Sequence, residues 1–404
     1  MKISTKDQQE NLVDKYKFSA NYVEDYGSFR DQILNKTIVP YQVEFQPPPK
    51  STKKICWLEC PYCYGLSADD SVGDRMNKEN AIKVMTDIAK GGVKKVIFAG
   101  YATDPLNCPF LEDLLEIAID NSMIFGFNTK LLKASDRLLK LLSRNDIMKG
   151  SYMSLSIDAG SNEVYNAMHS VRGNAKIYDM VLNNAIRVSK ARDKGSGFDI
   201  SAAYLINIHN NEVDEINQFI KHFRDKVYSN VIRFTFPQPP KDIPQQDGVV
   251  PNTMEKDSYI KKLSSLIVSS STKQTDVFIV DADSEHDIFN KPRTNPCFAR
   301  FVYPTIGYDG WLYHCSQSSS PNFRSMALGD LNKNSFWDLF YNYDENNFTN
   351  YLNSCSQKME ETGCRCDRKM HLTNSKVISS DVFENNRNFP ELKINTNWTR
   401  LNLK

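Results

Sequence analysis

Short apolar runs alternate with amphipathic segments of helix length along much of this chain, and this rhythm limits the possible folds more than any other feature. Six runs predict strands, at residues 39–45, 95–99, 123–128, 152–157, 199–206 and 231–236. Helical patterns lie between them, at residues 78–90, 110–120, 135–142, 175–194 and 212–224. Strands that alternate with helices of this length predict right-handed crossovers and a parallel sheet. We therefore expect an α/β fold, a partial (βα)6 barrel of the TIM type, with its chemistry at the carboxyl ends of the strands.

The rhythm changes near residue 240, where a loop rich in proline and glutamine begins. A helical pattern at residues 254–268 and a strand at 277–280 follow, and Asp309-Gly310 between apolar runs predicts a hairpin turn. These changes predict five parts: a lead-in at 1–38, the barrel at 39–240, a linking helix and strand at 241–284, a small cysteine-bearing α+β module at 285–372 and a tail at 373–404.

Charge and hydropathy exclude several classes of protein. Lysine and arginine total 50 and aspartate and glutamate 49, which leaves a net charge near +1. Because dedicated nucleic-acid binders usually carry a basic excess, we expect no nucleic-acid partner. The polar N-terminal segment contains no apolar run of the signal-peptide kind, and no stretch reaches the roughly 18 consecutive apolar residues of a membrane span. We expect a cytoplasmic protein without a membrane partner.

The nine cysteines are the most informative part of the composition. An odd number cannot pair completely in disulfides, and clustered cysteines in a reducing compartment are more often metal ligands or catalytic groups. Cys56, Cys60 and Cys63 form a C-x3-C-x2-C triplet, with Tyr62 directly before the third cysteine. The triplet alone cannot complete a tetrahedral zinc site, but it can hold three irons of a 4Fe–4S cluster and leave the fourth iron open. A zinc loop and accidental clustering are the alternatives.

The triplet and its aromatic residue resemble the signature of the radical S-adenosylmethionine (SAM) superfamily. The resemblance implies that the amino and carboxylate groups of SAM chelate the open iron of a 4Fe–4S cluster. It also implies that an electron from the cluster cleaves SAM to a 5′-deoxyadenosyl radical, which abstracts hydrogen from the substrate. A flavodoxin or a ferredoxin is the expected electron donor. The protein itself would position the reactants and exclude water.

The resemblance extends along the barrel and indicates residues that contact SAM. Residues 98–105 occupy the place of the family's Gly-Gly-Glu-Pro motif, although Asp104-Pro105 replaces Glu-Pro and the paired glycines are absent. The polar end of the fourth strand resembles the segment that holds the SAM ribose and carboxylate, and the end of the third resembles a position that faces the cofactor. The predicted cofactor-binding residues are Tyr62, Gly100, Thr103, Asp104, Asn128, Ser156 and Asp158.

A second group of cysteines surrounds the predicted hairpin. The spacing from Gly310 to Cys315 resembles the opening of SPASM and Twitch modules, which add auxiliary iron–sulfur clusters to radical SAM barrels. Full SPASM modules carry seven cysteines, whereas Lys358 and Arg368 stand at two of those positions here. We therefore expect one auxiliary cluster of the 4Fe–4S kind, with a zinc site as the alternative. Its ligands would be four of five cysteines: Cys297, Cys315, Cys355, Cys364 and Cys366.

Two cysteines are candidates for a catalytic role. Cys108 lies three residues after Pro105, near the predicted catalytic edge, and its thiol could return a hydrogen atom to a substrate radical. A lone cysteine is more often a small buried apolar residue. Cys355 is an alternative hydrogen donor where it is not a cluster ligand.

The resemblance leaves three functions to compare. The first is maturation of a ribosomally synthesised peptide by epimerisation or cross-linking, that is, chemistry of the oxidoreductase or epimerase type. The second is dehydrogenation or epimerisation of a small molecule such as an amino sugar. The third is a non-catalytic iron–sulfur or zinc protein, against which the open iron of the triplet argues. We expect a radical SAM enzyme with a peptide or small-molecule substrate.

Overall fold

The computed structural model describes most of the barrel and parts of the C-terminal region. The described residues are 23, 25–50, 56, 58–63, 75–101, 103–173, 175–195, 197–237, 249–279, 296–319, 321–364, 370, 373–374, 377–378, 380 and 382–383. The predicted cluster ligand Cys366 and the position Arg368 lie outside these residues, as do most of the predicted lead-in and tail.

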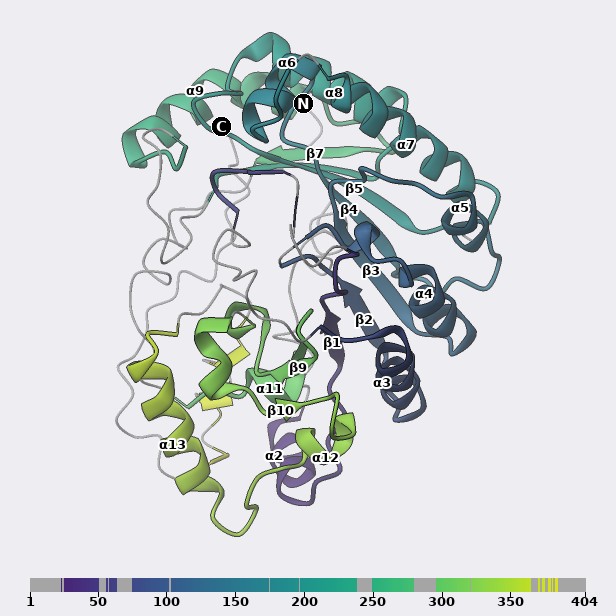
Figure 1. The fold of residues 1–404 in the computed structure, drawn as a ribbon. Helices are drawn as coiled ribbons and strands as arrows, with labels where there is room; N and C mark the ends of the chain where they lie inside the picture. Colours follow the sequence, from purple (N-terminus) through teal and green to yellow (C-terminus); the bar gives the residue numbers. More distant parts are fainter. Residues whose placement is uncertain are drawn as a thin grey trace.

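The described part of the chain forms one sheet of ten strands, in the order β10-β9-β8-β1-β2-β3-β4-β5-β6-β7 (Figure 1). Strands β1 to β7 are parallel to their neighbours throughout. The sheet is curved (Figure 1), and β7 ends the strand order without pairing with β1. The described part of the chain therefore forms an open partial barrel. The parallel strands are β1 (Gln42–Phe45), β2 (Lys95–Phe98), β3 (Ile124–Thr129), β4 (Tyr152–Ser156), β5 (Asp199–Leu205), β6 (Val231–Thr235) and β7 (Asp276–Ile279).

Helices follow the outer, convex side of this arc (Figure 1). Several begin at side chains that accept a hydrogen bond from the first turn, as Asn77, Ser135 and Ser161 do, and Asn252 forms a full capping box with Glu255. The helices of the barrel region are α3 (Lys78–Lys90), η2 (Pro105–Asn107), α4 (Leu111–Asp120), α5 (Asp136–Leu142), α6 (Asn162–Met168), α7 (Ile177–Arg192), α8 (Val213–Asp225) and α9 (Thr253–Ser269).

The predicted α/β fold is confirmed, and two elements differ from the prediction. Helix α6, with seven residues, was not predicted. The strand expected in a linking segment is β7, which pairs with β6 and adds a seventh parallel strand to the barrel. Helix α9 thus connects β6 with β7 in one more βαβ unit. The sequence did not indicate this unit, because a proline-rich loop precedes the helix.

The C-terminal region continues the same sheet. Strand β8 (Thr305–Ile306) pairs in parallel with β1, and β9 (Trp311–Tyr313) and β10 (Gly329–Asp330) follow in antiparallel order. The predicted turn is present: Gly310 has a φ of 80°, and the Asp309 carboxylate accepts a hydrogen bond from the Trp311 amide at 3.1 Å. The remaining helices are α2 (Tyr26–Leu34), α11 (Ala299–Val302), η3 (Ser316–Ser318), η4 (Pro321–Met326), α12 (Phe336–Phe340) and α13 (Phe348–Glu361).

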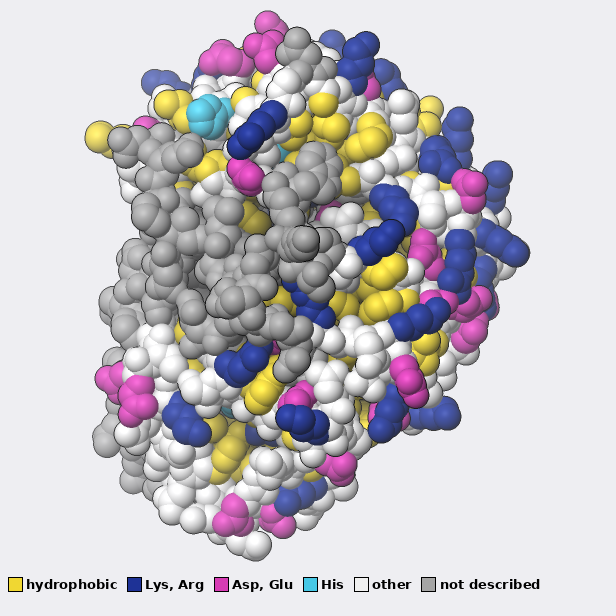
Figure 2. Space-filling model, in the orientation of Figure 1, with side chains coloured by type: hydrophobic (Ala, Val, Ile, Leu, Met, Phe, Trp, Pro, Cys, Tyr) yellow, Lys and Arg dark blue, Asp and Glu magenta, His cyan; other side chains and the backbone are white. Residues whose placement is uncertain are grey.

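Charges of both signs are interleaved over the helical outer side of the barrel (Figure 2). Arg137 of α5 bonds Asp113 and Glu116 of α4 at 2.7 and 2.8 Å, and Lys78 of α3 reaches Asp113 at 2.6 Å. Such exposed pairs contribute little individually, but they connect neighbouring helices. Within the described residues, no helix combines the length and the apolar character needed to cross a membrane.

Helix α12 fixes the C-terminal region to the barrel through Trp337. The Trp337 indole donates a hydrogen bond to the Asp87 carbonyl at 3.1 Å and covers Gly91, the residue that ends α3. A Cβ atom on Gly91 would lie 2.0 Å from Trp337 Cζ2, so only glycine allows this close approach. Gly91 and Trp337 are far apart in the sequence, and their contact depends on the absence of a side chain at position 91.

We expect Gly91→Ala to destabilise the protein by about 1–3 kcal/mol, because the methyl group would displace the indole ring. Urea unfolding of Gly91→Ala, Trp337→Ala and the double variant would measure the coupling between the two positions. In the Trp337→Ala background the alanine at position 91 should cost almost nothing. A single Gly91→Ala variant as stable as the unmodified chain would contradict the contact.

Candidate functional site

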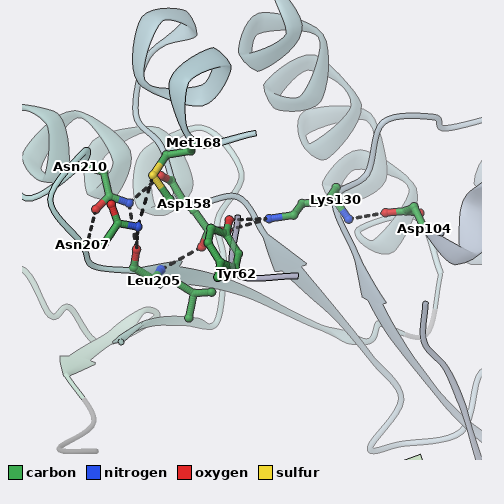
Figure 3. A network of polar contacts seen from close by, with 8 residues as sticks. All are labelled: Tyr62, Asp104, Lys130, Asp158, Met168, Leu205, Asn207 and Asn210. Atoms are coloured by element: carbon green, nitrogen blue, oxygen red, sulfur yellow. Dashed lines mark hydrogen bonds and ion pairs between the residues drawn. The ribbon is translucent and has the colours of Figure 1, made fainter. Parts of the chain in front are cut away.

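The predicted catalytic edge contains a buried polar network built on Asp158. This residue follows β4, is fully buried and has a φ of 62°, a left-handed conformation that aspartate tolerates better than most residues. Its Oδ2 atom accepts hydrogen bonds from the Tyr62 hydroxyl at 2.8 Å and from the Lys130 ammonium at 2.6 Å. Its Oδ1 atom accepts one from the Leu205 amide at 2.8 Å. Asp158 therefore joins the cysteine loop to the ends of β3, β4 and β5 (Figure 3).

Lys130 supplies the positive charge of the network. It follows β3, and its side chain is only 16% exposed. Burial acts to lower the pKa of Lys130, but the Asp158 carboxylate and the Cys60 thiol outweigh burial, and the pKa is raised above its usual value. Lys130 thus stays charged at neutral pH and holds a cation beside the cysteine loop. Sequence reasoning missed this residue, although it directly follows the segment that was singled out at the end of the third strand.

A second carboxylate, Asp104, connects the loop after β2 with the end of β3. Its oxygens accept hydrogen bonds from the Thr129 hydroxyl at 2.8 Å, the Lys130 amide at 2.5 Å and the Leu106 amide at 2.9 Å. Burial raises the pKa of Asp104, and the two backbone donors partly oppose this rise. Three donors of the chain itself already engage Asp104, which was predicted to bind SAM.

Gly100 and Thr103 shape the same loop. A Cβ atom on Gly100 would lie 1.7 Å from the Thr103 carbonyl oxygen, so the turn requires glycine. The Thr103 hydroxyl accepts a hydrogen bond from the Asn107 amide at 3.0 Å. Two other predicted residues lie outside the network: Asn128 is exposed near the end of β3, and Ser156 is half-buried at the end of β4.

The cysteine triplet lies against this network. Cys60 is 5% exposed, whereas Cys56 and Cys63 are partly buried, and all three are thiols. Burial raises the pKa of Cys60 to about 12, and Lys130 acts in the opposite direction. Two contacts shape the loop: the Cys63 amide donates to the Cys60 carbonyl at 3.0 Å, and the Glu59 amide donates to the His169 carbonyl at 3.2 Å.

The residues present fit an anionic iron–sulfur cluster. Among the described residues no three histidine, cysteine, aspartate or glutamate side chains converge on a single metal ion. A cubane does not require this convergence, because it spreads three thiolates over three irons. Lys130 offers a compensating charge, and the buried Tyr165 hydroxyl and His169 ring nitrogens have no hydrogen-bond partner among the described residues.

An asparagine turn after β5 supports the network from behind, and it was not predicted. The side-chain amide of Asn210 donates to the backbone carbonyls of Asp158 and Leu205, each at 2.9 Å, and so fixes the left-handed backbone of Asp158. The side-chain oxygen of Asn210 in turn accepts a hydrogen bond from the backbone amide of Asn207 at 2.8 Å. The side-chain amide of Asn207 contacts the Met168 sulfur at 3.3 Å (Figure 3). The sequence signal was the density of asparagine after the fifth strand.

Cys108 does not reach this network. It is 1% exposed and packs in the core after η2. Burial raises its pKa to about 12, which keeps the thiol protonated. This environment agrees with the apolar role considered from the sequence and does not test the hydrogen-donor role.

The C-terminal cysteines gather in a positively charged region. Cys297, Cys315 and Cys364 are buried and Cys355 is partly buried. Cys355 lines a cavity of about 180 Å³ together with Arg300, His314 and Lys358. Burial raises the pKa of Cys355, while Tyr351 and Arg300 lower it and Cys297 acts as a further nearby thiol. The two cysteines thus lie within electrostatic range of each other beside the buried Arg300 guanidinium.

Comparisons with known proteins agree with the fold and the site. Residues 51–222 match the model of the Radical SAM superfamily, and this segment includes the cysteine triplet and the whole Asp158 network. The match and the fold together identify residues 51–222 as a radical SAM domain. The family of this domain uses S-adenosylmethionine and a 4Fe–4S cluster.

A curated protein of Methanosarcina mazei, described as a probable GTP 3',8-cyclase, is 26% identical over 220 residues. The match covers 50% of this chain and 59% of that protein, so the chain spans less than two thirds of the relative's length.

Solved structures share the fold over most of the chain. SuiB of Streptococcus suis bound to S-adenosylmethionine is 12% identical with a TM-score of 0.54, and the match covers 85% of this chain and 73% of that one. The anSMEcpe protein with bound AdoMet and Cp18Cys peptide is 15% identical with a TM-score of 0.53, over 85% of this chain and 96% of that one. SuiB bound to its precursor peptide SuiA has a TM-score of 0.52 and 12% identity, over 77% and 67% of the two chains. In another SuiB structure the match covers 75% of this chain and 66% of that one.

We expect Lys130→Met to destabilise the protein by about 3–5 kcal/mol, because it leaves the Asp158 carboxylate buried without its cation. Urea unfolding of the cluster-free protein at neutral pH would measure the loss. The control is the double variant Lys130→Met with Asp158→Asn, since asparagine removes the charge and tolerates the left-handed backbone. Stability should return in large part. A double variant no more stable than Lys130→Met would contradict the importance of the ion pair.

Proposed function

We propose that this enzyme uses a 4Fe–4S cluster held by Cys56, Cys60 and Cys63 to modify a ribosomally synthesised peptide by epimerisation or cross-linking. The single observation that carries the cluster assignment is the position of the three thiols, against a buried lysine and above the carboxyl ends of parallel strands. When bound, the cluster supplies the electron that cleaves SAM to the radical that abstracts hydrogen from the substrate.

The surrounding residues bind and orient in this proposal. Tyr62 lies between the second and third cysteines and fixes the loop to Asp158. Lys130 balances the charge of the thiolates, as its effect on the pKa of Cys60 indicates. Exposed Asn128 and half-buried Ser156 remain the candidates for direct SAM contact, with Gly100 and Thr103 shaping the facing loop.

An auxiliary iron–sulfur cluster in the C-terminal region is part of the proposal. The nearness of Cys297 to Cys355, the nearby Arg300 and Lys358, and the cavity beside Cys355 support it, because an anionic cluster needs compensating positive charge. The fold likeness to SuiB and anSMEcpe reaches 85% of the chain and so extends well past the family segment at 51–222. A zinc site on the same cysteines is the alternative.

The choice of a peptide substrate is supported by the neighbours in structure. SuiB is known with the precursor peptide SuiA and anSMEcpe with the Cp18Cys peptide. A likeness at this level of identity shows the fold, and function has to be established at the site itself. The small-molecule alternative keeps support from the relative described as a GTP cyclase, which by its name acts on a nucleotide. If the substrate is a peptide, Cys355 is the better placed of the two candidate hydrogen donors. Cys355 borders a cavity, whereas Cys108 is buried in the core.

Cys56→Ala, Cys60→Ala and Cys63→Ala should each abolish SAM cleavage by the anaerobically reconstituted, dithionite-reduced protein, because each removes one cluster ligand. Release of 5′-deoxyadenosine, measured by chromatography, checks this. Cys315→Ala is the matched control, which should keep the cleavage while the iron content falls by about half. Zinc in place of that iron would overturn the auxiliary cluster, and SAM cleavage by all three triplet variants would overturn the first cluster.

Product mass distinguishes the substrates. A candidate precursor peptide should lose the mass of two hydrogen atoms on cross-linking. On epimerisation in D2O it should gain one deuterium, with no other change in mass. GTP and a nucleotide-linked amino sugar are the comparison substrates. Conversion of either small molecule, with the peptide unaltered, would replace the peptide function by the alternative.

A further inference from the structure

Two buried polar side chains of the radical site have no hydrogen-bond partner among the residues that the structure describes. They are Tyr165, on α6, and His169, which ends this helix. Both are fully buried, and their rings lie 4.1 Å apart between centroids. Within the described part of the chain, neither the Tyr165 hydroxyl nor the two ring nitrogens of His169 have a hydrogen-bond partner. An unbonded buried polar atom costs about 1–3 kcal/mol, so three of them at one place require an explanation.

Their position relates them to the cysteine loop. The Glu59 amide, one residue before Cys60, donates to the His169 carbonyl at 3.2 Å, which fixes the loop on the end of α6. Burial raises the pKa of Tyr165, and among the neighbouring charges that add to this rise Cys60 acts most strongly. Because the Tyr165 and His169 rings adjoin, the bond from Glu59 to His169 places both side chains on the helix end that contacts the cysteine loop.

A buried iron–sulfur cluster needs hydrogen-bond donors at this place. Thiolates and sulfides accept hydrogen bonds, and such bonds stabilise the reduced, more negative cluster and raise its reduction potential. Lys130 acts on Cys60, but it is already committed to Asp158 at 2.6 Å. Burial and the nearby Lys130 charge lower the pKa of His169 well below its usual value. The ring is thus neutral at pH 7 and offers one N–H donor.

We propose that the Tyr165 hydroxyl and the His169 ring donate hydrogen bonds to the sulfur atoms of the cluster held by Cys56, Cys60 and Cys63, and that they raise its reduction potential. The inference rests on the cluster assignment of the proposed function. It adds two positioning residues that tune the cluster and that belong to neither the cysteine triplet nor the SAM-contacting strand ends.

Tyr165→Phe removes only the hydroxyl oxygen. It tests the inference through the reduction potential of the cluster-loaded protein and the stability of the cluster-free protein. In the reconstituted protein without SAM, the midpoint potential of the cluster should become more negative. A tenfold loss in the reduction equilibrium corresponds to about 59 mV for a one-electron couple. Redox titration followed by electron paramagnetic resonance measures this shift, and the absence of SAM assigns it to the cluster. His169→Phe should shift the potential in the same direction.

In the cluster-free protein, Tyr165→Phe should leave stability unchanged or raise it, since the deleted hydroxyl has no partner in the described structure. Tyr178→Phe is the matched control. The Tyr178 hydroxyl is bonded to His222 Nδ1 at 2.8 Å, so its loss should lower stability and leave the potential unchanged.

The outcomes separate this inference from the proposed function. An unmodified chain that binds no cluster at the triplet overturns the proposed function and the inference with it. An unmodified chain with the cluster, and a Tyr165→Phe variant with the same potential, overturns the inference alone. A cluster-free Tyr165→Phe protein as destabilised as Tyr178→Phe would also overturn it, because the hydroxyl would then serve the fold.

Discussion

The ion pair between Lys130 and Asp158 is the interaction on which the radical site depends. Three strand ends and the cysteine loop meet at one carboxylate, which accepts from Lys130, Tyr62 and the Leu205 amide. Removing a buried charge from water costs several kcal/mol, and only a complete set of partners offsets this cost. The carboxyl ends of β3, β4 and β5 are therefore held in one arrangement, and the cysteine loop adopts its place because Tyr62 completes the set.

The sequence was sufficient for the framework of the barrel. Strand and helix periods predicted β1 to β6 and α3 to within a few residues, because each buried face repeats over enough positions to be recognised. Local chemistry was also readable: the C-x3-C-x2-C spacing indicated a radical SAM site, and Asp309-Gly310 predicted the hairpin. These features share one property, since each depends on residues that are close together in the chain.

The missed features depend on which side chains cross between elements. Lys130 follows a strand like many surface lysines, and only the neighbouring strand end shows that it is buried against Asp158. Tyr165 and His169 lie on a short helix, where an aromatic residue and a histidine suggest ordinary core packing. Their unbonded polar atoms become visible only once the packing around them is known. Strand β7 was assigned to a linker because its single short run gave no sign of its partner, β6.

The C-terminal hairpin belongs to the scaffold of the radical site. Strand β8 lies beside β1, and two residues that flank the cysteine loop contact the hairpin. The Gln46 amide donates to the Ile306 carbonyl at 2.9 Å, and the Met76 amide donates to the Tyr308 carbonyl at 3.4 Å. The Tyr308 ring also stacks near Tyr101, in the loop after β2. The hairpin therefore packs against chain segments on both sides of the cysteine triplet, although it carries none of the three thiols.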